Sequence, residues 1–204
     1  MFLPLQYIGR QALDFFQKVG ILSIFIAKTI SGLIRRPFYL SLILRQIISI
    51  GYFSLPVVAM TAVFSGAVLA LQSYTGFSRF SAESSIATVV VLSITRELGP
   101  VLAGLMVAGR VGAAIAAEIG TMKVTEQIDA LFTLSTDPIK YLVVPRVIAS
   151  VLTMPCLVLI GDIIGVMGGY LVSVYKLGFN GITYIKNTVE YLETIDVVSG
   201  LVKA

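Results

Sequence analysis

The sequence contains no histidine and a single cysteine, Cys156. Without histidine there is no HExxH metal site and no catalysis that depends on an imidazole. One cysteine excludes both a disulfide within the chain and a CxxC redox or metal site. The GxxxxGK phosphate loop and the GxSxG nucleophile turn are also missing from the sequence. We therefore expect a protein that is not an enzyme.

Charge is scarce as well. Charged residues make up 13% of the chain and hydrophobic residues 57%, with a mean hydropathy of +0.95, whereas soluble domains are about half apolar and about a quarter charged. The segment 46–78 contains no Asp, Glu, Lys or Arg. It exceeds the about 20 apolar residues that a helix needs to cross a bilayer. The sequence predicts an integral membrane protein.

The basic residues gather near the N-terminus. Among residues 1–45 the acidic residue is Asp14, and the basic residues are Arg10, Lys18, Lys28, Arg35, Arg36 and Arg45. Such an excess beside the first span is typical of the cytoplasmic side. It predicts a cytoplasmic N-terminus and explains the net charge of +4 without a nucleic-acid partner. The large apolar side chains between these charges predict an amphipathic helix in the membrane interface over residues 1–45.

Three further apolar segments predict the spans of an all-α integral membrane protein with a single domain, residues 1–204. We expect complete transmembrane helices at 47–72, 84–116 and 147–175. Residues 197–204 are too few to cross, and we expect them to begin a fourth span that continues beyond this sequence. Each complete span carries small residues at every fourth position, including Gly66, Gly112 and Gly165, which predicts close helix packing.

A polar segment separates the second and third predicted spans. Residues 118–135 show helical spacing of apolar side chains and carry Glu118, Glu126 and Asp129 against Lys123. Helices that rest on lipid tend to be basic on their polar face. The acidic character therefore favours a cytoplasmic helix that docks on another protein.

Arg96 and Glu97 lie inside the second predicted span. A charged residue at the bilayer centre costs about 3 kcal/mol on insertion scales and normally faces protein or a wet cavity. The pair either fixes helix packing or lines a substrate path, and the second interpretation is favoured. Neighbouring residues on a helix point about 100° apart. We therefore expect Glu97 to face a cavity and Arg96 to contact a packing partner.

Three blocks of sequence are more specific: SAESS, TRELGPVLAGLMVAGRVGAAIAAEIGTMKVTEQIDAL and DPIKYLVVPR. They resemble the MlaE (YrbE) family of permeases, the membrane subunits of bacterial ABC transporters that move phospholipids between the inner and outer membranes. The resemblance covers residues 47–203. The sequence departs from the family at its end, because relatives continue through a complete fourth span and a fifth.

The resemblance implies an interfacial helix, five spans and a coupling helix between the second and third span, in the bacterial inner membrane with a cytoplasmic N-terminus. The implied partners are a second permease copy, a cytoplasmic ABC ATPase, a periplasmic MCE-domain lipid-binding protein and a small cytoplasmic regulatory subunit. Phospholipid is the implied substrate. ATP and Mg are used by the partner ATPase, and this chain is expected to bind no cofactor.

The resemblance also implies site residues, none of them catalytic or metal-binding. The expected substrate-cavity residues are Glu97, Arg96, Lys203, Leu69, Gly76 and Phe80. The expected ATPase-coupling residues are Glu118, Met122, Glu126, Gln127, Asp129 and Leu131.

Two other functions remain as alternatives. An ion-coupled secondary transporter would use the charges within the span, but such folds often contain internal repeats, and the spans show no convincing repeat. A membrane scaffold without transport would require neither Glu97 inside a span nor an acidic docking helix.

Overall fold

The computed structural model describes residues 3–35, 39–80 and 85–204. Within these residues the protein is all-helical, without a β-strand. The helices, in chain order, are α1 (Leu3–Ile34), α2 (Leu40–Ile50), η1 (Tyr52–Ser54), α3 (Leu55–Phe77), η2 (Ser78–Phe80), α4 (Ile86–Ser93), η4 (Ile94–Leu98), α5 (Gly99–Val124), α6 (Gln127–Thr133), η5 (Ile139–Val143), α7 (Val144–Tyr175), α8 (Gly181–Tyr191) and α9 (Thr194–Lys203).

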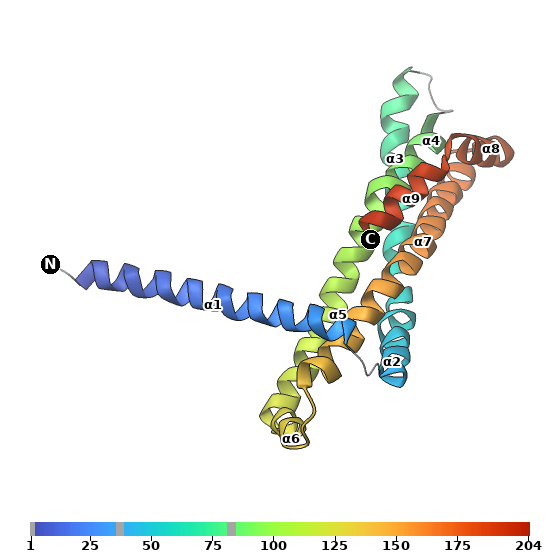
Figure 1. The fold of residues 1–204 in the computed structure, drawn as a ribbon. Helices are drawn as coiled ribbons and strands as arrows, with labels where there is room; N and C mark the ends of the chain where they lie inside the picture. The colour runs from blue at the N-terminus through green and yellow to red at the C-terminus, as the bar shows by residue number, and fades with distance from the viewer. Residues whose placement is uncertain (1–2, 36–38, 81–84) are drawn as a thin grey trace.

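The three complete predicted spans are confirmed as long helical segments that run side by side in one bundle (Figure 1). The segments Leu40–Phe77, Ile86–Val124 and Ile139–Tyr175 are each long and apolar enough to cross a membrane. Each is longer than predicted, because helical structure continues past the apolar stretch into polar residues such as Glu118. The predicted start of the second span at residue 84 lies outside the described residues.

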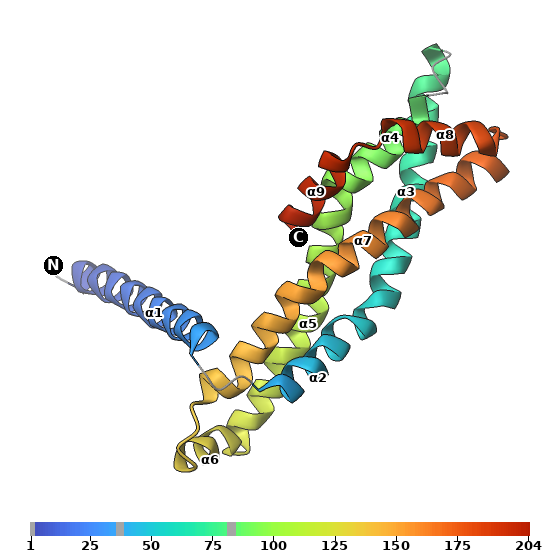
Figure 2. The ribbon, with the colours of Figure 1, turned by 45° about the vertical axis from the view of Figure 1, so that its right-hand side comes forward.

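Helix α1 does not run along the bundle. Figures 1 and 2 show it projecting sideways from the α6 end of the bundle, and its C-terminal part contacts η5 and α7. Its large apolar side chains, among them Phe15, Phe16 and Ile21, are exposed. Residues Gly9–Ile34 would also satisfy the length and composition of a span. The sideways direction supports the interfacial helix, which stays a prediction.

Small residues bring α3 and α7 into backbone contact, as predicted. A methyl group added at Gly66 would collide with the carbonyl of Gly165, and one added at Gly168 would collide with the carbonyl of Val63. Small residues allow this approach, which gives membrane helices much of their packing energy. The same expectation is wrong within this chain for α5. Gly112 is exposed and would have no neighbour within 4 Å of an added methyl group.

The segment predicted as one coupling helix, 118–135, is divided in the structure. Helix α5 continues to Val124, Glu126 adopts a left-handed conformation with φ of 59°, and α6 follows from Gln127. A non-glycine residue in this conformation breaks an α-helix. The break turns α6 across the end of the bundle (Figure 1). The six predicted coupling residues are therefore shared between the end of α5, the break and α6.

At the opposite end, the segment 176–196 contains the short helix α8 and the first residues of α9. Asn180 caps α8, since its side chain accepts hydrogen bonds from the backbone N–H groups of Ile182 and Thr183. Tyr184 is buried against α7. Helix α9 begins at Thr194, three residues before the predicted position, and turns back beside the junction of α4 and α5 (Figure 2).

Candidate functional site: a charged turn beside an apolar groove

Arg96 and Glu97 lie on a π-helical turn, η4, between α4 and α5. The backbone N–H of Gly99 donates to the carbonyl of Ile94, which closes the wide turn. Pro100 follows and has no N–H, so the carbonyl of Arg96 lacks the partner that an α-helix would supply. The Nζ of Lys203 donates to this carbonyl at 2.9 Å. Single π turns inside α-helices are frequent at functional sites.

The Arg96 guanidinium pairs with the carboxylate of Asp196. Both its Nε and its Nη2 lie 2.5 Å from Oδ1 of Asp196. The Asp196 side chain is only 2% exposed, and its other oxygen accepts a hydrogen bond from the backbone N–H of Glu193 at the start of α9. The buried carboxylate is therefore neutralised by Arg96.

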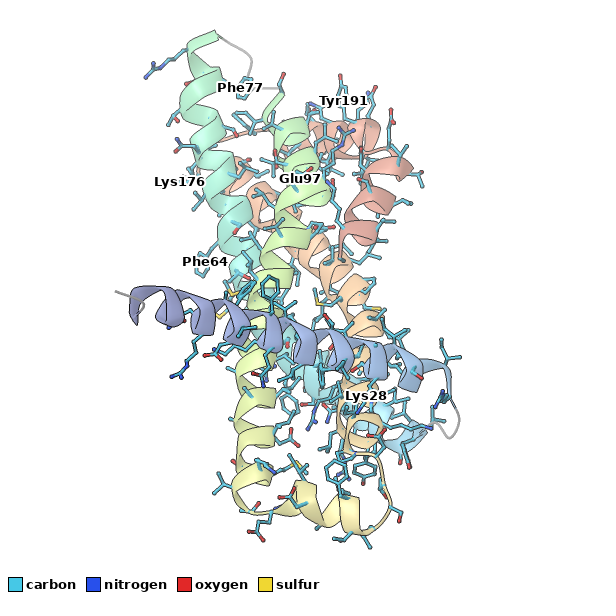
Figure 3. The ribbon with its side chains drawn as sticks, turned by 60° about the vertical axis from the view of Figure 1, so that its left-hand side comes forward. Lys28, Phe64, Phe77, Glu97, Lys176 and Tyr191 are labelled. Atoms are coloured by element: carbon cyan, nitrogen blue, oxygen red, sulfur yellow. The ribbon has the colours of Figure 1, made fainter. Side chains whose placement is uncertain are left out.

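Glu97 pairs with Lys203. Their charged atoms lie 2.5 Å apart. The Glu97 side chain is 67% exposed, and Figure 3 shows Glu97 in the half of the bundle away from α6. Between the two ion pairs, Gly200 of α9 lies so close to the carbonyl of Thr95 that an added methyl group would collide with it. Both ends of α9 are thus fastened to the turn that carries Arg96 and Glu97.

Asp162 is a further acidic residue at this turn. It is buried on α7, and its Oδ1 has no hydrogen-bond partner among the described residues. This oxygen occupies the place that a side chain on Gly99 would need. In the sequence Asp162 is an isolated acid within a span. The sequence signal that could have identified its neighbour is Gly99, two residues after Glu97, because a glycine permits close approach.

An apolar groove of ≈ 440 Å³ begins beside the charged turn. Leu98, the residue after Glu97, forms part of its wall. The lining residues are Phe64, Ser65, Val68, Leu69 and Gln72 of α3, Leu98 of η4 and Leu102 of α5. A charged turn that is followed in the chain by a residue of an apolar wall offers the two kinds of surface that an amphiphilic ligand needs.

The structure brings three of the six predicted cavity residues into contact and places a fourth in the neighbouring groove. Arg96, Glu97 and Lys203 meet at the turn, and Leu69 lines the groove. Gly76 lies exposed near the end of α3, and a methyl group added there would contact no neighbour within 4 Å. The side chain of Phe80 lies outside the described part of the chain, as do residues 81–84 of the SAESS block.

The predicted coupling residues have different partners. Glu118 is paired with Arg146 of α7 at 2.6 Å, and Asp129 is paired with Lys123 at 3.1 Å. Glu126 and Gln127 are exposed where α6 begins, whereas Met122 and Leu131 are half-buried. Asp129, Glu126 and Gln127 therefore remain on the outer face of the loop, and Glu118 is directed toward the bundle.

Comparison with known proteins identifies relatives across almost the whole chain. The family model described as Permease MlaE matches residues 43–204. The chain is 75% identical over 197 residues to a probable ABC transporter permease protein of Rickettsia felis, covering 97% of this chain and 76% of that protein. It is 36% identical over 200 residues to the intermembrane phospholipid transport system permease protein MlaE of Haemophilus influenzae, covering 97% and 76%.

A plant relative is matched over a smaller share of its own length. The chain is 40% identical over 163 residues to the protein TRIGALACTOSYLDIACYLGLYCEROL 1, chloroplastic, of Arabidopsis thaliana, covering 79% of this chain and 46% of that protein. The relatives and the helical spans agree on a multi-pass permease subunit, which lacks ATPase activity and works with a separate ATPase. The chain belongs to the MlaE permease family of ABC transporters.

Proposed function

We propose that this permease moves phospholipids between the inner and outer bacterial membranes, and that the charged turn and the groove form its lipid-binding site. The single observation that carries the proposal is the Glu97–Lys203 pair, whose carboxylate belongs to the residue directly before Leu98 in the wall of the apolar groove. A phospholipid has the matching chemistry, with a charged head group next to acyl chains. The relative from Haemophilus influenzae is named as a phospholipid transport permease, which supports the same substrate class.

Within this site, Glu97 and Lys203 handle the head group, and Leu69, Leu98 and Leu102 contact an acyl chain. Lys203 is a donor to the phosphate oxygens, and Glu97 holds it in place until a phosphate competes for it. Because both side chains are partly exposed, exchanging one partner for another requires no rearrangement of the core. Gly76 and Phe80 would extend the site toward the outer end of α3.

The proposed assembly contains two permease copies, a cytoplasmic ATPase that uses ATP and Mg, a periplasmic MCE-domain lipid-binding protein and a small regulatory subunit. The ATPase docks on the face that carries Met122, Glu126, Gln127, Asp129 and Leu131. The acidic side chains of this face suit a basic groove on the ATPase. With the N-terminus and α6 in the cytoplasm, α8 lies on the periplasmic side, and the permease itself needs no cofactor.

Glu97→Gln tests the site, because it removes the charge and keeps the shape of the side chain. We expect complexes of normal yield that hydrolyse ATP but transfer labelled phospholipid between vesicles about tenfold more slowly, a loss of about 1.4 kcal/mol. Glu190→Gln on α8 is the matched control, since Glu190 is exposed and belongs to a different helix. Unchanged lipid transfer by a folded Glu97→Gln complex would contradict the proposed site.

The two alternatives are weaker for this family. An ion-coupled carrier would move lipid without nucleotide, and a scaffold would move none. Vesicles that contain the complex should transfer phospholipid only when ATP is supplied inside the compartment that faces α6. Transfer driven by an ion gradient alone would favour the secondary transporter, and no transfer under either condition would favour the scaffold.

A further inference from the structure

Arg146 is a buried cation at the cytoplasmic start of α7. Its side chain is 6% exposed. Its Nη2 lies 2.6 Å from Oε2 of Glu118, and its Nη1 donates to the carbonyl of Leu142 at 3.0 Å. Arg146 therefore joins three segments: the last turns of α5, the π turn η5 and the first turn of α7. The structure thus gives Arg146 a specific carboxylate partner.

The pair closes the base of the cytoplasmic loop. Glu118 lies six residues before the end of α5, and Arg146 is the third residue of α7. The segment between them, which contains α6, connects the end of α5 to the start of α7 (Figure 2). A guanidinium that is almost fully buried must keep its partner, because losing the carboxylate would leave an uncompensated charge. The end of α5 and the start of α7 are therefore held together by this pair and move together.

The other ion pair of this loop, Lys123–Asp129, differs in its exposure to solvent. Lys123 and Asp129 lie 3.1 Å apart, and both side chains are more than half exposed. Exposed pairs of this type are screened by solvent and contribute little. This pair also stays within the loop, since it joins the end of α5 to α6. It provides an internal comparison for the Glu118–Arg146 pair.

We propose that Glu118 and Arg146 are positioning residues that transmit displacement of the cytoplasmic loop to α7, and so couple ATP hydrolysis to lipid movement; this rests on the proposed function. When the ATPase moves α6, the end of α5 moves with it. The ion pair makes the start of α7 follow. Helix α7 lies in backbone contact with α3, which forms one wall of the lipid groove. The displacement therefore reaches the groove through packed helices.

The test uses the full-length permease assembled with its ATPase and compares phospholipid transferred per ATP hydrolysed. Glu118→Gln should lower this ratio by about tenfold, within the about 5- to 150-fold range of coupling effects. Glu118→Asp keeps the charge and should retain most of the ratio. Lys123→Gln breaks the exposed pair and should leave the ratio at the wild-type value. Arg146→Met is less suitable, because removing a buried cation can prevent folding.

Two results would overturn the proposal: a wild-type ratio in Glu118→Gln, or an equal loss in Glu118→Asp or Lys123→Gln. A second measurement does not depend on the substrate. Spin labels on α6 and on the outer half of α7 should change their separation when ATP binds, and Glu118→Gln should abolish that change. If the wild-type complex moves no phospholipid but the label distance changes, the proposed function fails and the coupling pair stands. A change that persists in Glu118→Gln refutes the coupling pair.

Discussion

Pro100 explains, at the scale of single residues, why a lysine from a distant helix reaches the charged turn. Proline leaves the carbonyl of Arg96 without its usual donor, and Lys203 supplies one. The same ammonium pairs with Glu97. One side chain thus satisfies a backbone group and a carboxylate that would both be costly in an apolar environment.

Gly99 provides the residue-scale prediction. Gly99→Ala would place a methyl group where Asp162 Oδ1 lies, and overpacking of this kind costs about 1–3 kcal/mol. We expect a lower unfolding temperature in detergent. Asp162→Ala removes the obstructing carboxyl, so Gly99→Ala should cost less in that background.

Gly104→Ala is the control for this prediction, because the nearest atom to its added methyl group is Met154 Cε at 3.9 Å, an ordinary contact. An equal loss of stability from Gly99→Ala with and without Asp162 would show that the two residues do not compete for space.

At the scale of elements, a glycine supports helix packing only where its face of the helix meets another helix. Gly66 and Gly112 lie on the two kinds of face. Gly66→Leu should prevent the approach of α3 to α7, because the carbonyl of Gly165 occupies that space. Gly112→Leu adds the same side chain to an exposed face of α5 and should leave the fold of the single chain unchanged. Thermal unfolding of both variants as monomers in detergent measures the contrast, and similar losses would contradict it.

The elements differ in how far the sequence could predict them. Long uncharged runs such as 46–78 locate the spans, since hydropathy and length suffice. The end of α5 was missed because the polar residue Glu118 reads as the start of a new helix, whereas the break occurs at Glu126 through its backbone conformation. The π turn at Arg96 escaped prediction for another reason. Its partners, Asp196 and Lys203, are about 100 residues away in the chain.

The residues of the candidate site also differ in how far the sequence could predict them. Arg96, Glu97 and Lys203 could be selected from the cost of charge in a span and from the resemblance. The ion-pair partner of Glu118 could not be selected in this way. Arg146 belongs to a different helix and looks like an ordinary interfacial anchor in the sequence. The contact of Asp162 with the charged turn is not evident in the sequence, because its neighbour there is a glycine rather than another acid.

The molecule as a whole has one predicted orientation, which labelling can test. In a Cys156→Ala background, a cysteine at Thr133 in α6 should react with a membrane-impermeant maleimide only after the inner membrane is opened. A cysteine at Lys186 in α8 should react from the periplasm without opening it. Both positions are exposed. The reversed pattern of labelling would invert the topology and place the N-terminus outside.

The fastening of α9 to the charged turn has a consequence for biosynthesis. Asp196 follows Arg96 by 100 residues, and Lys203 follows Glu97 by 106. At about 5–20 residues per second, these partners leave the ribosome about 5–20 seconds after the charges that they neutralise. During that interval the nascent second span holds an arginine and a glutamate without their final counter-ions. We expect the insertion machinery to shelter this segment until α9 arrives.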